Sequence, residues 1–109
     1  RLVSTGYNGF PRGIEDLDDR LNNREEKYKY VVHAEMNCIY NANYHNQSLK
    51  GSTMYIVGLP VCHECAKGII QAGVVRVVAE FKDAPLKWAK STEITQKMFK
   101  EAGVIYDQI

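Results

Sequence analysis

The chain has 109 residues, of which 45% are hydrophobic and 25% charged, and its formal net charge is +1. A chain of this length forms one domain and can bury about two thirds of its unfolded surface without disulfides. The near-neutral charge argues against non-specific nucleic-acid binding through a strongly basic face and fits a small-molecule ligand. No apolar run approaches the ~18 residues of a membrane span. We therefore expect a single domain over residues 1–109 with no secretory signal, membrane or nucleic-acid partner.

The N-terminal part combines a β-branched run with a glycine-rich loop. Residues 1–5 are typical of the end of a strand, so we expect a first helix and strand to precede them in the natural protein. Residues 6–13, GYNGFPRG, exclude regular structure and allow the backbone to approach a ligand closely. A tight connection is one interpretation, but the loop also carries groups that suit a base, a sugar hydroxyl and a phosphate. These groups belong to Tyr7, Asn8, Phe10 and Arg12.

Residues 14–29 are polar and rich in both signs of charge. Such a stretch is usually a solvated loop or a short exposed helix, and a lid or a subunit contact is the alternative.

From His33 onwards the pattern becomes helical. Positions i, i+3, i+4 and i+7 form one face of this helix. They are occupied by Glu35, Cys38, Ile39 and Ala42. A carboxylate at the start of an apolar, inward-facing stripe is costly unless it is paired or used, so Glu35 is a candidate catalytic residue. Residues two apart on a helix point roughly 200° apart. His33 can therefore face inward beside Glu35 only from the first residue of the helix. Cys38 is expected to be a small core residue.

A strand and a second helix follow. Residues 53–57 are β-branched and aromatic and end at Gly58, which is typical of a buried strand. A C-x-x-C motif then leads into a helical pattern that ends at Gly73. Cys62 and Cys65 are therefore expected side by side in the first turn, where the positive end of the helix favours thiolates.

The remaining residues continue the alternation of strands and helices. Residues 74–79 are a β-branched strand and 83–90 a loop with the sole tryptophan. Ser91 is expected to cap a helix that ends at Gly103, and residues 104–106 are an edge strand. This order predicts an α/β fold, a three-layer αβα sandwich with helices on both faces of a central mixed, largely parallel sheet.

Three residues form a ligand set for zinc: His33, Cys62 and Cys65. A catalytic zinc keeps its fourth position open, and a water there has its pKa lowered from ~15.7 towards ~7. Glu35 is the group that would move protons to and from that water. A structural zinc site would need a fourth protein ligand, for which the spare candidates are Cys38, His45 and His63. A redox dithiol is the alternative for an isolated C-x-x-C. With three cysteines in all, a reducing compartment, the cytoplasm, suits these thiols best.

The order H-x-E, strand, C-x-x-C, helix matches zinc-dependent nucleobase deaminases. Together with the loop GYNGFPRG, it makes the chain resemble the deoxycytidylate (dCMP) deaminases of the cytidine deaminase-like superfamily over nearly its whole length. The zinc motifs place it in the superfamily, and the loop indicates the dCMP branch. One departure is Val61, which stands between Pro60 and Cys62 where the family usually has proline directly before the first cysteine.

The resemblance implies a reaction and a set of site residues. The reaction is conversion of dCMP to dUMP and ammonia, which supplies dUMP for dTTP synthesis. One catalytic Zn²⁺ per chain would be bound by His33, Cys62 and Cys65, with Glu35 as proton shuttle. The implied nucleotide contacts are Tyr7, Asn8, Gly9, Arg12, Ala34 and Asn37. The resemblance also implies homo-oligomers, often hexamers, with activation by dCTP and Mg²⁺ and inhibition by dTTP in many members.

Two other functions fit parts of the pattern. One is deamination of another amine, such as cytidine, an adenosine in tRNA or a pterin-like ring, although an RNA substrate favours a larger basic surface than +1 provides. A nucleotide phosphate needs only one or two of the available cations: Arg12, Arg24, Lys27 and Lys29. The other is a non-catalytic zinc-stabilised nucleotide sensor, which would have no use for Glu35.

Overall fold

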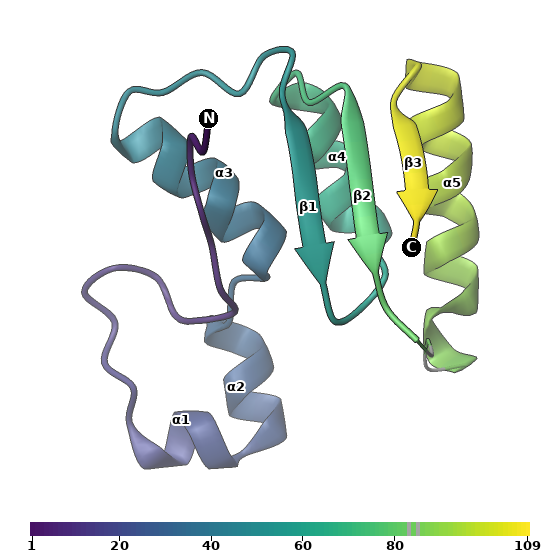
Figure 1. The fold of residues 1–109 in the computed structure, drawn as a ribbon. Helices are drawn as coiled ribbons and strands as arrows, with labels where there is room; N and C mark the ends of the chain where they lie inside the picture. Colours follow the sequence, from purple (N-terminus) through teal and green to yellow (C-terminus); the bar gives the residue numbers. More distant parts are fainter. Residues whose placement is uncertain (83, 85) are drawn as a thin grey trace.

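A computed structural model describes residues 1–82, 84 and 86–109. Its centre is a parallel sheet in the order β1-β2-β3 (Figure 1). The strands are β1 (Thr53–Val57), β2 (Arg76–Glu80) and β3 (Ile105–Gln108). All three expected strands in this half of the chain are present, displaced by up to two residues at their ends. The predicted α/β class with a largely parallel sheet is confirmed.

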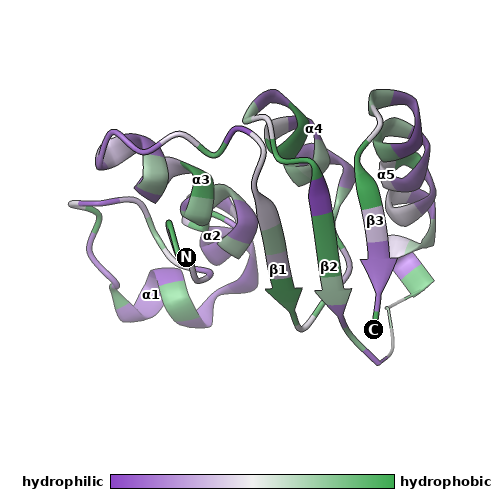
Figure 2. Ribbon diagram, turned by 45° about the horizontal axis from the view of Figure 1, so that its top comes forward, coloured by the Kyte–Doolittle hydropathy of each residue, from purple (hydrophilic) through white to green (hydrophobic). Residues whose placement is uncertain are grey.

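One face of the sheet carries the core. The register pairs Met54 with Val77 and Ile56 with Ala79, and all four side chains are buried. They pack against two helices, α4 (His63–Gln71) and α5 (Ala89–Ala102), whose buried side chains include Ile69 and Phe99. Figure 2 shows mostly hydrophobic colour along β2 and mixed colour along α5, as expected for a buried strand and a surface helix.

The alternate residues of β1 lie on the opposite face. Tyr55 is 73% and Val57 78% exposed, in agreement with the alternating burial of that strand. In Figure 1 the viewer looks onto this face, with α4 behind the sheet.

Three helices precede the sheet: α1 (Asp18–Asn22), α2 (Arg24–Tyr30) and α3 (Ala34–Tyr44). The expectation that residues 14–29 are exposed is confirmed, because neither α1 nor α2 has a buried residue. Asn23 caps α2 by accepting hydrogen bonds from the backbone N–H groups of Glu25 and Glu26. No helix among the described residues is both long and apolar enough to cross a membrane.

The helix α3 packs closely on α4. At Gly68 of α4, a Cβ would lie 2.5 Å from the sulfur of Met36 on α3, so a larger residue there would require the Met36 side chain to move. The contact brings the N-terminal ends of the two helices together.

Two local predictions are wrong. Residues 1–5 are not in a strand; instead Ser4 Oγ donates to the carbonyl of Cys38 and Asn41 Nδ2 donates to that of Thr5, so the segment follows α3. Ser91 is not a cap, because a 3-10 turn, η1 (Leu86–Trp88), leads directly into α5 at Ala89. The expected loop at 83–90 includes Asp83 and Pro85, which lie outside the described residues.

The N-terminal segment reaches α3 through Gly6. A Cβ at Gly6 would lie 2.8 Å from Cys38 Cα and closer still to the backbone nitrogen of Cys38 and the backbone oxygen of Ala34. These are helix backbone atoms that cannot move aside as a flexible side chain would. Any other residue at this position must therefore push the segment off the helix.

We predict that Gly6→Ala lowers the free energy of unfolding by about 1–3 kcal/mol, the usual cost of overpacking. Gly9→Ala is the matched control, because its Cβ would meet no described atom within 4 Å and its backbone is not left-handed. The control should stay within about 1 kcal/mol of the parent protein. Urea denaturation of the three proteins measures both effects, and equal stability of the two variants would contradict the close contact at Gly6.

Candidate metal centre

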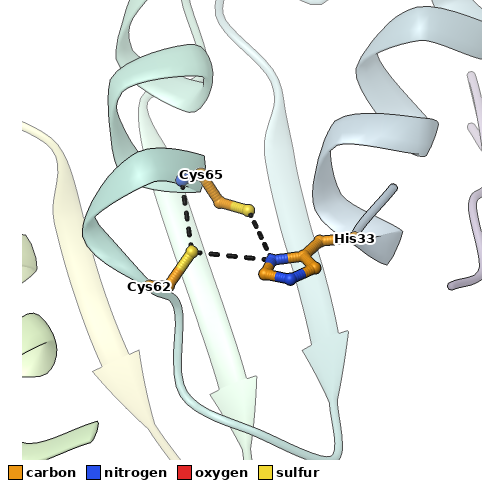
Figure 3. Close-up of side chains that lie close together, drawn as sticks. All are labelled: His33, Cys62 and Cys65. Carbon is orange, nitrogen blue, oxygen red and sulfur yellow. Dashed lines mark hydrogen bonds between the residues drawn. The ribbon is translucent and has the colours of Figure 1, made fainter. Parts of the chain in front are cut away.

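The side chain of His33 meets those of Cys62 and Cys65, which lie 29 and 32 residues further along the chain (Figure 3). His33 Nδ1 lies 3.3 Å from Cys65 Sγ and 3.6 Å from Cys62 Sγ. The three ligand atoms all lie within 4.8 Å of one another, so they can share a metal ion. In Figure 3 the imidazole extends from the start of α3 towards both sulfurs at the start of α4.

The position of His33 follows from the helix start. His33 is the N-cap of α3, and its extended backbone (φ −64°, ψ 152°) releases the ring from the helical periodicity. His33 was expected to be the first residue of the helix. The structure places it one residue earlier, so its ring is free to face inward as expected. His33 itself provides no capping side chain. Instead Asn8 Oδ1 accepts the N–H of Ala34 at 2.7 Å, so the glycine-rich loop caps the helix.

The two cysteines are placed by α4. Cys62 is the N-cap of this helix, and its sulfur accepts the backbone N–H of Cys65 at 3.4 Å. Cys65 lies in the first turn, as predicted, and is buried. The positive ends of α3 and α4 both point at the sulfurs, which favours negative charge there.

The two thiols form a coupled pair. The hydrogen bond with Cys65, with help from His33, lowers the pKa of Cys62 to about 4. The same hydrogen bond, together with burial, raises the pKa of Cys65. The pair therefore favours a thiolate at Cys62 over one at Cys65. The hydrogen bond with Cys62 raises the pKa of His33.

Glu35 lies beside these groups. Burial raises the pKa of its carboxyl above the usual value, while the neighbouring His33 charge acts in the opposite direction. The Glu35 carboxyl also raises the pKa of Cys65, because its negative charge disfavours a second thiolate nearby. A raised pKa makes this carboxyl easier to protonate beside the ligand set, which suits a general acid–base group.

The donor set fits zinc. One imidazole nitrogen and two thiolate sulfurs are typical zinc ligands, and three protein ligands leave a fourth position for water or substrate. The spare candidates lie elsewhere. His63 Nδ1 is 2.8 Å from Ser91 Oγ on α5. Cys38 packs against the core, and His45 is the C-cap of α3, at the opposite end of that helix from His33. Among the described residues, the group able to hold a metal therefore consists of His33, Cys62 and Cys65.

Two clefts open beside this group and share Val32 and Tyr40. The first, about 390 Å³, is lined by Val31, Val32, His33, Met36, Tyr40, Glu64 and Cys65. The second, about 550 Å³, is lined by residues 7–12 together with Val32, Asn37, Tyr40 and Asn41. Of the six expected nucleotide contacts, five line the larger cleft: Tyr7, Asn8, Gly9, Arg12 and Asn37. Ala34 lines neither cleft, and its N–H is bonded to Asn8.

Tyr40 is a cleft residue that the sequence analysis missed. It stands four residues after Met36 on α3, and both side chains line the smaller cleft. That spacing was the available signal, because residues i and i+4 share a helix face.

The loop residues are held to α3. Asn37 Nδ2 donates to the carbonyl of Tyr7 at 2.7 Å. Arg12 donates to Asn41 Oδ1, and its guanidinium lies 3.9 Å from the centre of the Tyr44 ring. The glycine-rich loop is thus fixed as one wall of the larger cleft.

Comparison with known proteins gives a consistent picture. Residues 1–81 match the family model of the cytidine and deoxycytidylate deaminase zinc-binding region. The chain is 40% identical to mouse deoxycytidylate deaminase and 42% identical to the human protein, with 97% of this chain aligned in each case. It spans about 60% of the length of these two relatives. A deaminase of Aliivibrio fischeri is 37% identical, and the chain covers 69% of it.

Solved structures support the fold. The dCMP deaminase of cyanophage S-TIM5, solved in complex with dCMP and dUMP, superposes with a TM-score of 0.73 at 24% identity. The match covers 100% of this chain and 74% of the phage protein. The apo form of that protein gives a TM-score of 0.71. The site geometry, the family match and the fold agree, and the chain belongs to the family of the cytidine and deoxycytidylate deaminase zinc-binding region.

Proposed function

We propose that residues 1–109 form a single deaminase domain of a zinc-dependent hydrolase that converts dCMP to dUMP and ammonia, and so supplies dUMP for dTTP synthesis. The observation that carries the proposal is a partly buried carboxyl, Glu35, beside three side chains that can hold one metal ion. A metal site that only stabilised the fold would not need this carboxyl. The deoxycytidylate deaminases among the relatives support the choice of substrate.

The metal would be held by His33 Nδ1 and by the sulfurs of Cys62 and Cys65. When bound there, zinc would supply a water of lowered pKa as the nucleophile. Metal binding there would require both sulfurs as thiolates, because thiolates and not thiols ligate zinc. His33 would bind through Nδ1, the nitrogen that faces both sulfurs, and keep its proton on Nε2.

Glu35 would carry the protons. Its carboxylate accepts a proton as the water oxygen forms a bond to C4 of the cytosine ring, and delivers it to ring nitrogen N3. Glu35 would then take the remaining proton of the oxygen bonded to C4 and give it to the exocyclic amine, so that the C4–N bond breaks, ammonia leaves with both electrons of that bond, and C4 becomes a carbonyl. A raised pKa brings Glu35 closer to the pH at which it can both accept and donate.

The substrate would occupy both clefts. The base would enter the smaller cleft, where His33 and Cys65 form part of the wall. The sugar and phosphate would extend along the larger cleft past Tyr7, Asn8 and Gly9. Asn37 would keep the loop in place through its hydrogen bond to Tyr7. Arg12 is the candidate for binding the phosphate, because its cationic side chain lines this cleft.

The proposal extends to an assembly of identical subunits in the cytoplasm, regulated by dCTP with Mg²⁺ and by dTTP. Exposed apolar side chains support an assembly, among them Tyr55 and Val57 on the open face of the sheet. Three free thiols, two of them in the proposed metal site, suit a reducing compartment.

An ammonia-release assay on the purified full-length protein tests the substrate. With dCMP, deoxycytidine, cytidine and dCTP side by side, dCMP should have the highest kcat/KM. Loss of the charge-assisted hydrogen bonds to its phosphate should lower kcat/KM for deoxycytidine about 10–100-fold. Equal values for dCMP and deoxycytidine would contradict dCMP as the substrate, and ammonia from none of the four would contradict deamination of cytosine nucleotides.

The second test is Glu35→Gln. Glutamine keeps the shape of the side chain but cannot move a proton, so kcat should fall by about 10²–10⁴ while zinc content stays at one per chain. Glu93→Gln is the control, since this carboxylate is exposed on α5 and faces Lys97. Steady-state kinetics and metal analysis measure both. Unchanged turnover in Glu35→Gln would end this mechanism.

A further inference from the structure

The backbone on both sides of Cys62 is hydrogen-bonded to side chains of α5. Thr95 Oγ1 donates to the carbonyl of Val61 at 2.9 Å. On the other side of the cysteine, the backbone N–H of His63 donates to Ser91 Oγ at 2.9 Å. The peptide groups that flank the first sulfur ligand are thus anchored by two hydroxyls one helical turn apart.

The Thr95 contact is fully buried. Thr95 and Val61 are both 0% exposed, so the carbonyl of Val61 cannot turn to water if the hydroxyl is lost. Threonine within a helix commonly turns its hydroxyl back to its own helix, whereas Thr95 donates across to the segment before α4. The long-range hydrogen bond explains a polar residue in the core.

A third contact completes the arrangement. The N–H of Val61 donates to Tyr106 Oη on β3 at 3.4 Å. The ring of Tyr106 packs edge-on against the ring of Phe99, with the two ring centres 5.3 Å apart. Unlike Pro60 before it, Val61 has a free φ and an N–H that needs a partner. Side chains of α5 and β3 therefore fix a position that proline would fix by itself.

Ser91 also turns His63 away from the metal group. Its Oγ lies 2.8 Å from His63 Nδ1, while His63 Nε2 lies 3.5 Å from Glu64 Oε1. One hydroxyl thus accepts the backbone N–H of His63 and also contacts Nδ1 of the same residue. Ser91 thereby anchors the His63 ring on the α5 side of the turn.

We propose that Thr95 and Ser91 are positioning residues that hold Cys62 in its metal-binding geometry and so set the affinity of the site for zinc. This rests on the proposed function, because it takes His33, Cys62 and Cys65 as the ligands. Groups that orient metal ligands typically change metal affinity 10–100-fold when they are removed. Ligand geometry is sensitive to such support because small displacements weaken a preorganised site.

Four variants of the full-length protein test the proposal: Thr95→Val, Thr95→Ser, Ser91→Ala and Thr92→Val. Thr92→Val is the matched control, because the buried hydroxyl of Thr92 on the same helix has no hydrogen-bond partner among the described residues. Zinc affinity is measured by competition with a chromophoric chelator. The thiolate-to-metal charge-transfer band of the Co²⁺-substituted protein reports the geometry of the sulfurs independently of activity, and circular dichroism confirms folding.

We expect Thr95→Val and Ser91→Ala to weaken zinc binding about 10–100-fold and to shift the cobalt band. Thr95→Ser should restore both, and Thr92→Val should change neither. Folded Thr95→Val with parental affinity and spectrum would overturn the proposal. If Thr95→Val does not fold, Ser91→Ala decides in the same way, because its hydroxyl is only partly buried. If the parent protein binds neither zinc nor cobalt, the proposed function fails as well, which separates the two outcomes.

Discussion

The meeting of two helix N-termini is the constraint on which the site depends. The N-cap residues of α3 and α4 are His33 and Cys62, and their ligand atoms lie 3.6 Å apart. An N-cap residue has a non-helical backbone, so its side chain can point along the helix axis and not out to the side. Two such ends facing each other place an imidazole and two sulfurs around one point, in a field that favours thiolates. The place of the partly buried Glu35 beside this group follows from the same arrangement, because Glu35 occupies the first turn of α3.

The rest of the fold keeps these two ends in place. Gly68 of α4 lies against Met36 of α3, and α4 packs on one face of the parallel sheet. The glycine-rich loop caps α3 through Asn8 and forms the wall of the larger cleft. The loop therefore stabilises the helix that carries His33 while it lines the space proposed for the nucleotide. His63 stays outside the group formed by His33, Cys62 and Cys65, since Ser91 holds its ring through a contact with Nδ1.

The sequence predicted the features that depend on nearby residues, such as the starts of the two helices that carry the proposed metal ligands. The spacing of His33 and Glu35 required a helix start at the histidine, and the C-x-x-C followed by a helical pattern placed both cysteines in a first turn; the structure agrees with both. Ser91 was misread because the sequence does not reveal that the 3-10 turn before it continues into α5. The bond from Thr95 to Val61 spans 34 residues, so no local pattern could reveal it. Residues 1–5 follow α3 because of hydrogen bonds to Cys38 and Asn41, which are equally non-local.

X-ray absorption at the zinc edge of the full-length protein tests the central claim most directly. The account predicts two sulfur ligands at about 2.3 Å and two lighter ligands at about 2.0–2.2 Å, only one of them an imidazole. That result would correspond to Cys62, Cys65 and His33 with one exchangeable position. A third sulfur, a second imidazole or a shell without sulfur would contradict it, because each requires a protein ligand outside the group that the two helix ends bring together.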